Sequence, residues 1–220
     1  MLANELISQI IPSLKPGDTG FMALGWMEEF KISHLPIVKN GEYLGLISDS
    51  DIIDLNEPEE TLGSAYSHIV KPFVIEDQHV YEVMRVISEH KLTAIPVLDN
   101  SNRYLGLISL SDLIQKISLM AAVNEPGGIL VLEMNQNDYS LSQIAQIVEG
   151  NNTRILSCFV TNSLETGKLE VTIKLNRTDL SAVLQTFERY NYKVLSYVQE
   201  KEHFEDVKSR YDEFMRFLNI

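Results

Sequence analysis

The amino-acid sequence predicts a mixed fold, α/β and α+β: two tandem repeats of the order β-α-β-β-α, a ferredoxin-like β-α-β-β-α-β domain, and a C-terminal helix. Three observations lead to this prediction. The word YLGLISDSD at residues 43–51 returns as YLGLISLSD at residues 104–112. A Pro/Gly break, VNEPGG at 123–128, follows the second copy. Beyond the break, apolar runs and helical patterns succeed one another in the order β-α-β-β-α-β.

Each repeat contains a predicted β-hairpin. The stretch HLPIVKNGEYLGLISDSDIID (34–54) holds two runs rich in Val, Ile and Leu around the turn KNGE. The stretch AIPVLDNSNRYLGLISLSDLIQ (94–115) repeats the pattern around the turn DNSNR, which is one residue longer. The repeat therefore extends well beyond the shared word.

Helical patterns flank each hairpin. TGFMALGWMEEF (19–30) and HVYEVMRVISEH (79–90) space their apolar residues near the helical period of 3.6, and a short helix follows each hairpin. One such unit, of roughly 55–60 residues, is small for a core of its own, so we expect the copies to pack on each other. We assign residues 1–57 to motif 1 and residues 58–122 to motif 2.

The repeated word places chemistry at a helix start. Ser-x-x-Asp occurs as Ser48 with Asp51 and as Ser109 with Asp112. One interpretation is a capping box, in which the Ser accepts a backbone N–H and the acid reaches back to the strand end. Another is a binding site, because a carboxylate can accept from two ribose hydroxyls and a helix start can hold a phosphate.

The two copies resemble a tandem pair of CBS domains, also called a Bateman module. The resemblance covers residues ~1–120 and is carried by the Pro, Gly, Ser and Asp that both copies contain. It implies a cleft that binds an adenosine-containing ligand such as AMP, ADP, ATP or S-adenosylmethionine. It also implies that Asp51 and Asp112 hold the ribose and that Ser48 and Ser109 contact ribose or phosphate. Backbone before the two prolines would frame the adenine, at these residues: His34, Leu35, Ala94 and Ile95.

His34 makes the two copies unequal, because Ala94 stands at the same place in motif 2. In some members of the family a basic residue at this position reaches a phosphate. A histidine there would make binding sensitive to pH. The alternative is a polar side chain that faces solvent beside a strand.

The second half of the chain predicts a separate domain. Its elements are a strand at 128–135, a helix at 140–150, a hairpin around NSLETG, a helix at 179–190 and a strand at 192–198. This order resembles an ACT domain, and we assign residues 128–200 to it. ACT domains usually carry a Gly in the first turn, which here reads NQNDYSL, and Tyr139 would crowd an amino-acid ligand. We therefore favour a role in dimerisation or in signal relay.

The last segment, residues 201–220, has the apolar spacing of an amphipathic helix. Docking onto its own domain explains such a pattern, and so does contact with a subunit or partner. Its length and acidic content argue against a membrane helix.

Composition excludes several classes of protein. The formal net charge is −13, and no basic stripe is available to neutralise the phosphates of nucleic acid. No apolar run has the length of a membrane span, and the start lacks the pattern of a signal peptide. The single Cys158 excludes an internal disulfide, and we read it as a core residue. We expect a cytoplasmic protein.

The sequence contains none of the common catalytic or metal-binding motifs. We therefore expect a non-catalytic regulatory protein that senses an adenine nucleotide, without cofactor or metal, and acts through another, unidentified protein. The alternative is a scaffold whose clefts are empty and whose surfaces bind a partner. An enzyme with a site built from scattered residues is a third reading. The predicted association is a two-fold homodimer.

Overall fold

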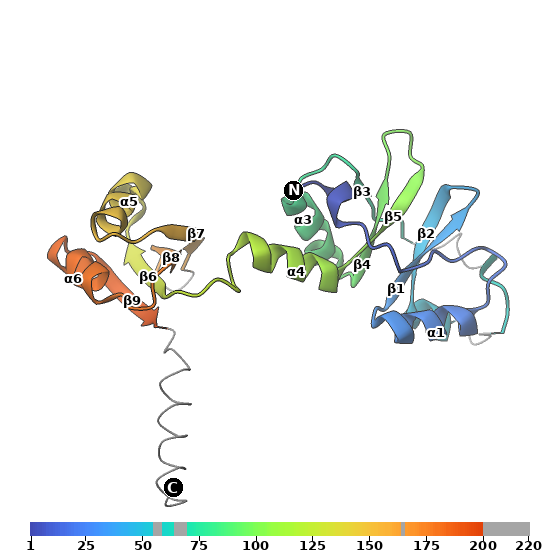
Figure 1. Cartoon of the computed structure of the whole chain (residues 1–220). Helices are drawn as coiled ribbons and strands as arrows, with labels where there is room; N and C mark the ends of the chain where they lie inside the picture. Colours follow the sequence, from blue (N-terminus) through green and yellow to red (C-terminus); the bar gives the residue numbers. More distant parts are fainter. Residues whose placement is uncertain (55–58, 64–69, 164–165, 200–220) are drawn as a thin grey trace, which may run out of the picture. The chain divides into compact units, whose positions relative to one another are not determined.

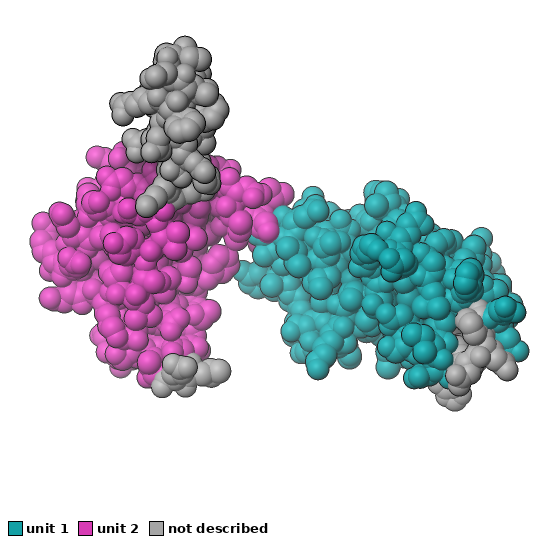
Figure 2. All heavy atoms as spheres, turned by 90° about the horizontal axis from the view of Figure 1, so that it is seen from below, with its two compact units in different colours: residues 1–117 teal, residues 118–220 magenta. Residues whose placement is uncertain are grey.

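A computed structural model describes residues 1–54, 59–63, 70–163 and 166–199. The chain divides into two compact units, residues 1–117 and residues 118–220, which Figure 2 distinguishes by colour. Each unit has its own hydrophobic core, and each is described by itself. The predicted C-terminal helix at 201–220 lies outside the described residues.

Motif 1 has the predicted hairpin. Its elements are η1 (Ala3–Leu6), α1 (Gly20–Phe30), β1 (His34–Lys39), β2 (Glu42–Ser48) and α2 (Asp49–Asp54). Strands β1 and β2 pair antiparallel, with His34 opposite Ser48. The two-residue turn between them has positive φ at both Asn40 (53°) and Gly41 (83°), as a tight hairpin turn requires. The Asn-Gly pair thus sets this hairpin locally.

Motif 2 repeats this arrangement. Its elements are β3 (Val74–Ile75), α3 (Val80–His90), β4 (Ala94–Leu98), β5 (Tyr104–Ser109) and α4 (Leu110–Met120). Strand β3 runs parallel to β4, and β4 pairs antiparallel with β5. A register shift between Val97 and Leu98 matches the shift between Ile37 and Val38 in motif 1. The repeat therefore extends to the irregularity of the hairpin.

The first strand of motif 1 is reduced to a single bridge. Leu14 pairs in parallel with Ile37, as Val74 pairs with Val97 in motif 2. The Leu14 N–H donates to the Pro36 carbonyl, and the Val38 N–H donates to the Leu14 carbonyl. The first strand that the sequence predicts for motif 1 is thus present at one residue.

The start of the chain packs on motif 2, although its position in the sequence places it in motif 1. Ala3 and Leu6 are buried in the core of motif 2, and the chain start lies beside α3 in Figure 1. Ile7 lies against Gly106, where an added Cβ would come within 2.3 Å of the Ile7 Cγ2. The Gly of the repeated word therefore permits this close approach.

The two motifs share their cores, which confirms that the copies pack on each other. The core around α1 and β1 contains Ala94 and Leu107 of motif 2. The core around α3 and β4 contains Tyr43 and Leu46 of motif 1. Each fully buried Leu or Ile stabilises the fold by about 1.5–3 kcal/mol, so the shared core holds the motifs together.

Unit 2 has the predicted β-α-β-β-α-β order. Its elements are β6 (Ile129–Met134), η3 (Gln136–Asp138), α5 (Leu141–Gly150), β7 (Ile155–Asn162), β8 (Leu169–Leu175), α6 (Ser181–Arg189) and β9 (Lys193–Val198). The strands form one antiparallel sheet in the order β7-β8-β6-β9. Helices α5 and α6 cover one face of this sheet (Figure 1). Strand β8 alternates buried and half-buried residues, as a strand with one covered face must.

Within the described residues, the helices are too short or too polar to cross a membrane.

Candidate functional site

The Ser-x-x-Asp word of motif 1 forms a reciprocal box at the start of α2. The Asp51 N–H donates to the Ser48 Oγ at 3.1 Å. In return, the Asp51 Oδ2 accepts from the Ser48 backbone N–H at 2.8 Å and from the Ser48 hydroxyl at 2.7 Å. Strand end and helix start are thereby fixed to each other, as the capping interpretation predicts.

The word of motif 2 forms a similar box in a more buried setting, in which the bond to the carboxylate comes from the Ser109 hydroxyl. The Ser109 hydroxyl donates to the Asp112 Oδ2 at 2.7 Å, and the Asp112 N–H donates to the Ser109 Oγ at 3.1 Å. Ser109 is only 1% exposed, and its hydroxyl also lies 2.8 Å from the Ser111 Oγ. Asp112 is half-buried, whereas Asp51 is exposed.

The caps engage one oxygen of each Asp carboxylate. In both boxes the bonds to the carboxylate go to Oδ2. Within the described part of the chain, Oδ1 of Asp51 and of Asp112 therefore keeps its capacity to accept from another donor, such as a ribose hydroxyl. The structure thus makes the capping and binding interpretations compatible. We call His34, Ser48 and Asp51 the motif-1 half-site, and Ala94, Ser109 and Asp112 the motif-2 half-site.

His34 joins the two motifs. The Thr93 N–H donates to the His34 Nδ1 at 3.3 Å, and the Thr93 Oγ1 lies 2.9 Å from the same nitrogen. The Ser33 N–H donates to that Oγ1 at 2.8 Å. Because Nδ1 accepts a hydrogen bond, the neutral ring carries its proton on Nε2. His34 is half-buried, and its Nδ1 is bonded to Thr93 of the other motif.

Two carboxylates of motif 1 lie close to the His34 ring. Burial lowers the pKa of His34, while the negative charges of Asp49 and Asp51 oppose that shift. Partial burial would raise the pKa of Asp49, but hydrogen bonds from Ser33 and Ser50 outweigh it, and this pKa lies below its ordinary value. At neutral pH this group therefore holds a neutral imidazole beside the ionised Asp49 carboxylate.

Apart from His34, the residues before the two prolines can offer only backbone to a ligand. The side chains of Leu35 and Ile95 are fully buried in the two cores, and Ala94 is also fully buried. This agrees with the predicted role of their backbone, which remains a prediction.

Sequence reasoning missed Thr93 and Asp49. Their signal was present in the alignment of the copies, SHLP over TAIP and ISDSD over ISLSD, where Thr93 replaces Ser33 and Leu110 replaces Asp49. What the sequence could not show was that Thr93 bonds to the ring of His34 in the other motif.

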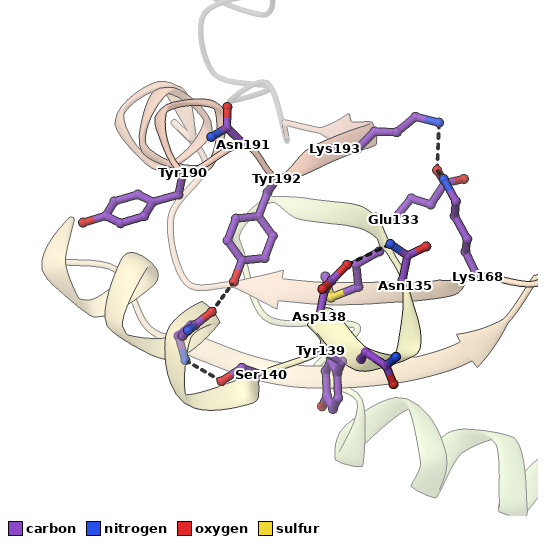
Figure 3. Close-up of a pocket in the computed structure, with 13 residues that line it drawn as sticks. Glu133, Asn135, Asp138, Tyr139, Ser140, Lys168, Tyr190, Asn191, Tyr192 and Lys193 are labelled. Carbon is purple, nitrogen blue, oxygen red and sulfur yellow. Dashed lines mark hydrogen bonds and ion pairs between the residues drawn. The ribbon is translucent and has the colours of Figure 1, made fainter.

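Unit 2 contains a cavity of about 550 Å³ at the turn that follows β6. Figure 3 shows Tyr139 and Ser140 on one side of it, and Tyr192, whose hydroxyl donates to the Gln143 side chain at 3.2 Å, on another. The Asn135 amide donates to the Asp138 Oδ2 at 2.8 Å. A cavity is therefore present at this turn, and Tyr139 is one of the residues that line it.

Glu133 is the buried charge of this cavity. It is 6% exposed, and its Oε1 pairs with the Lys193 Nζ at 2.8 Å and with the Lys168 Nζ at 3.0 Å (Figure 3). The hydrogen bonds from Lys193 and Lys168 lower the pKa of Glu133. The two lysines and the two acids, Glu133 and Asp138, leave the cavity formally neutral.

Among the residues that the structure describes, no three His, Cys, Asp or Glu side chains come together as a metal site. Cys158 is half-buried against the unit-2 core, and burial raises the pKa of its thiol, which disfavours the reactive thiolate.

Comparison with known proteins places the repeat in a family. A family model described as CBS domain matches residues 3–57 and 68–119. Inosine-5'-monophosphate dehydrogenase of Streptococcus pyogenes is 35% identical over 113 residues, which cover 48% of this chain and 22% of that enzyme. The Methanocaldococcus jannaschii enzyme is 23% identical over 148 residues, which cover 67% of this chain and 30% of that enzyme. The chain thus spans less than a third of the length of these relatives.

Solved structures of similar fold include a Vibrio cholerae protein named for acetoin utilization, AcuB. It is 21% identical, with a TM-score of 0.49, and the match covers 56% of this chain and 95% of that one. Another, CBSX2 in complex with AMP, is 19% identical, with a TM-score of 0.45, and the match covers 54% of this chain and 96% of that one. In both cases the likeness extends over about half of this chain.

Proposed function

Because residues 3–57 and 68–119 are a tandem pair of CBS domains, we propose that the chain is a non-catalytic sensor that binds an adenosine-containing nucleotide of the AMP, ADP or ATP class between its two motifs. Binding would be relayed to a separate, unidentified protein. The ferredoxin-like domain would serve dimerisation or relay.

The observation that carries this proposal is the pair of Ser-Asp boxes. Both use Oδ2 for the cap and leave Oδ1 of Asp51 and Asp112 for a ribose hydroxyl. The motifs also share their cores and join at His34 and Thr93, so a ligand that contacts one motif lies close to the other. CBS domains are in general regulatory and nucleotide-binding, which supports the same reading.

The test is to change each Asp and measure two quantities on the same protein. Asp51→Ala and Asp112→Ala should each weaken the affinity of any half-site that holds a ribose by about ten- to hundredfold, since a charge-assisted hydrogen bond contributes roughly 1.5–3 kcal/mol. Each change should also lower stability by about 0.5–2 kcal/mol, because it removes half of a cap. Glu29→Ala, which removes an exposed acid from α1, is the matched control.

Loss of stability without loss of affinity would contradict the proposed role of these carboxylates. If the unchanged chain binds no adenosine compound at all, the repeat is a fold signature and the chain is a scaffold for a partner protein.

A further inference from the structure

The two motifs of unit 1 are bonded to each other at both ends of their hairpins. Strands β1 and β4 lie against each other but belong to separate sheets. Near the hairpin turns, a backbone bond joins the motifs, from the Tyr104 N–H to the Gly41 carbonyl at 2.8 Å. At the opposite end, where β1 and β4 begin, the bonds run through the side chains of His34 and Thr93. This second connection therefore depends on side-chain chemistry.

The His34 joint, formed by Ser33, His34 and Thr93, satisfies one backbone N–H of each motif. The Thr93 N–H donates to the His34 Nδ1 at 3.3 Å, and the Ser33 N–H donates to the Thr93 Oγ1 at 2.8 Å. The Ser33 carbonyl accepts from the Asp49 N–H at 3.1 Å, and the Thr93 carbonyl accepts from the Leu110 N–H at 2.9 Å. The joint therefore connects the start of α2 to the start of α4.

A proton removes the acceptor at the centre of this joint. The neutral ring offers Nδ1 as an acceptor, and the Thr93 Oγ1 lies 2.9 Å from it. An imidazolium carries protons on both ring nitrogens and accepts no hydrogen bond. Protonation of His34 would therefore leave the Thr93 N–H facing another N–H, and the Thr93 hydroxyl would have to turn from donor to acceptor. A backbone N–H that loses its partner in a partly buried place is costly.

The charged groups that act on the ring are Asp49 and Asp51 of α2, and the motif-2 segment that faces it contributes the uncharged Thr93. Burial lowers the pKa of His34 from 6.5, and the two carboxylates limit that shift. The ring therefore takes up its proton only as the pH falls below 6.5. Motif 2 has Ala94 at the equivalent position, so one histidine alone brings titration to the joint.

We infer that His34 makes the packing of the two motifs sensitive to pH: its protonation opens the motif boundary at the His34 joint, while the Tyr104 end stays closed. The proton would act as a ligand that loosens the start of α2 from the start of α4. The inference concerns unit 1 alone and does not depend on which nucleotide the chain binds.

Amide hydrogen exchange of the full chain, followed by NMR from pH ~7.5 to ~5, tests this opening. Protection factors, which correct for the intrinsic dependence of exchange on pH, should fall about tenfold or more at Thr93 and at Ser33, because their hydrogen bonds weaken. The Tyr104 amide also bonds across the motifs, and as the internal control it should keep its protection. The NMR titration of the His34 ring should have its midpoint below pH 6.5, where the Thr93 protection falls.

His34→Asn separates protonation from folding. Asparagine places an amide oxygen near the position of Nδ1 and does not titrate, so Thr93 and Ser33 should keep their protection at pH ~5. His90→Asn, which removes an exposed histidine from the end of α3, is the matched control. The stabilising effect of neutral His34 is fully present above pH 6.5 and is lost as the pH falls through the folded-state pKa. The melting temperature of His34→Asn should therefore fall less on acidification than that of the unchanged chain or of His90→Asn.

Several outcomes would overturn the inference. One is protection at Thr93 and Ser33 that stays constant while the His34 ring titrates, and another is a ring that stays neutral down to pH ~5. Loss at Thr93 alone would show a local rearrangement, and equal loss at Tyr104 would show that the whole motif pair loosens. If His34→Asn folds poorly, the ring midpoint and the amide protection of the unchanged chain decide the question.

Discussion

At the scale of single residues, two polar contacts of the candidate sites join segments that lie far apart in the sequence. Thr93 fixes the tautomer of His34 across the motif boundary, and Glu133 gathers two lysines that lie far from it in the sequence. Both contacts depend on the tertiary fold. A single-sequence pattern shows the residue types but not their partners.

Glu133 predicts a pH dependence of stability. Its folded-state pKa lies below the ordinary value of 4.5, so its contribution is fully present above that pH and is lost as pH falls through the folded-state pKa. Glu133→Gln should therefore lower the melting temperature at neutral pH, because the two lysines lose their partner. The difference from the unchanged chain should shrink as the pH drops below ~4.

The control for this change is Glu170→Gln on the neighbouring strand β8, where Glu170 lies directly opposite Glu133. Within the described residues Glu170 makes no ion pair through its side chain. Its substitution should leave the melting curve nearly unchanged at either pH. Equal effects at both positions would show that the lysine contacts do not stabilise the fold.

At the scale of elements, the sequence was most informative where structure is set locally. Turn residues predict the β1–β2 and β4–β5 hairpins, and the helical period predicts α1 and α3. The Ser-x-x-Asp spacing predicts the two caps. The reduction of the first strand to Leu14 and the insertion of Ala3 and Leu6 into the motif-2 core do not follow from local pattern. Those outcomes depend on which surface is available to cover apolar side chains.

The difference between local pattern and tertiary packing also applies to the candidate site. The repeated word identified four site residues, and the structure shows that they form the two boxes: Ser48, Asp51, Ser109 and Asp112. Neither repetition nor a motif marked His79. It caps α3 by accepting the Tyr81 N–H through its Nδ1 at 3.3 Å. Histidine is not among the residues preferred at that position, so pattern alone gave no signal.

The connection into unit 2 depends on Gly127. Its φ is +150°, and an added Cβ would lie 1.8 Å from the Leu175 carbonyl oxygen. Gly127→Ala should therefore destabilise unit 2 by roughly 2 kcal/mol or more, since both the backbone conformation and the space are unsuitable for a side chain.

Gly150→Ala is the matched control for Gly127→Ala in the same unit, because nothing lies within 4 Å of an added Cβ there. Its effect should stay within about 1 kcal/mol. Denaturant unfolding followed by circular dichroism compares the two. A Gly127→Ala chain as stable as the control would show that strand β8 can move aside.

The turn after β6 leads to a negative prediction about ligands. The cavity there is large enough for a small molecule, but both lysines pair with Glu133 and Asp138 accepts from Asn135. A free amino acid would have to break these pairs to place its own two charges. Calorimetry with the twenty amino acids should show no saturable binding with a dissociation constant below about millimolar. That limit corresponds to a binding free energy of ~4 kcal/mol. Binding tighter than this limit would show that an amino acid can displace the charge pairs of the cavity.

At the scale of the whole molecule, unit 1 predicts a homodimer. A groove of about 500 Å³ lies between α3 and α4 and is lined mainly by apolar side chains: Met84, Ile87, Ser88, Lys91, Leu92, Thr93, Leu110, Leu113, Ile114 and Ile117. Exposed apolar grooves of this kind mark interaction sites. A two-fold contact would place the same groove of each copy against the other.

Met84→Asp should break this dimer, because it places a charge in the groove at a position that is already 37% exposed and so is not needed for the core. Ile10→Asp, at a 75% exposed position away from α3 and α4 in the sequence, is the control. Light scattering should give twice the 25.0 kDa chain mass for the unchanged protein and the control, and the single mass for Met84→Asp. A single mass for the unchanged protein would contradict the prediction.

The identical hexapeptide YLGLIS in β2 and β5 raises the question of which partner each strand finds while the chain folds. Strand β1 would meet the same side chains in β5 as in β2, so side-chain chemistry alone does not select the native hairpin. The native pairing closes a turn of a few residues, whereas the crossed pairing would enclose about sixty. Since each doubling of a loop costs about 0.6 kcal/mol, the crossed pairing is disfavoured by roughly 2–3 kcal/mol. Chain connectivity, through the short turns, thus directs two interchangeable strands to their own neighbours and keeps the duplicated halves from exchanging them.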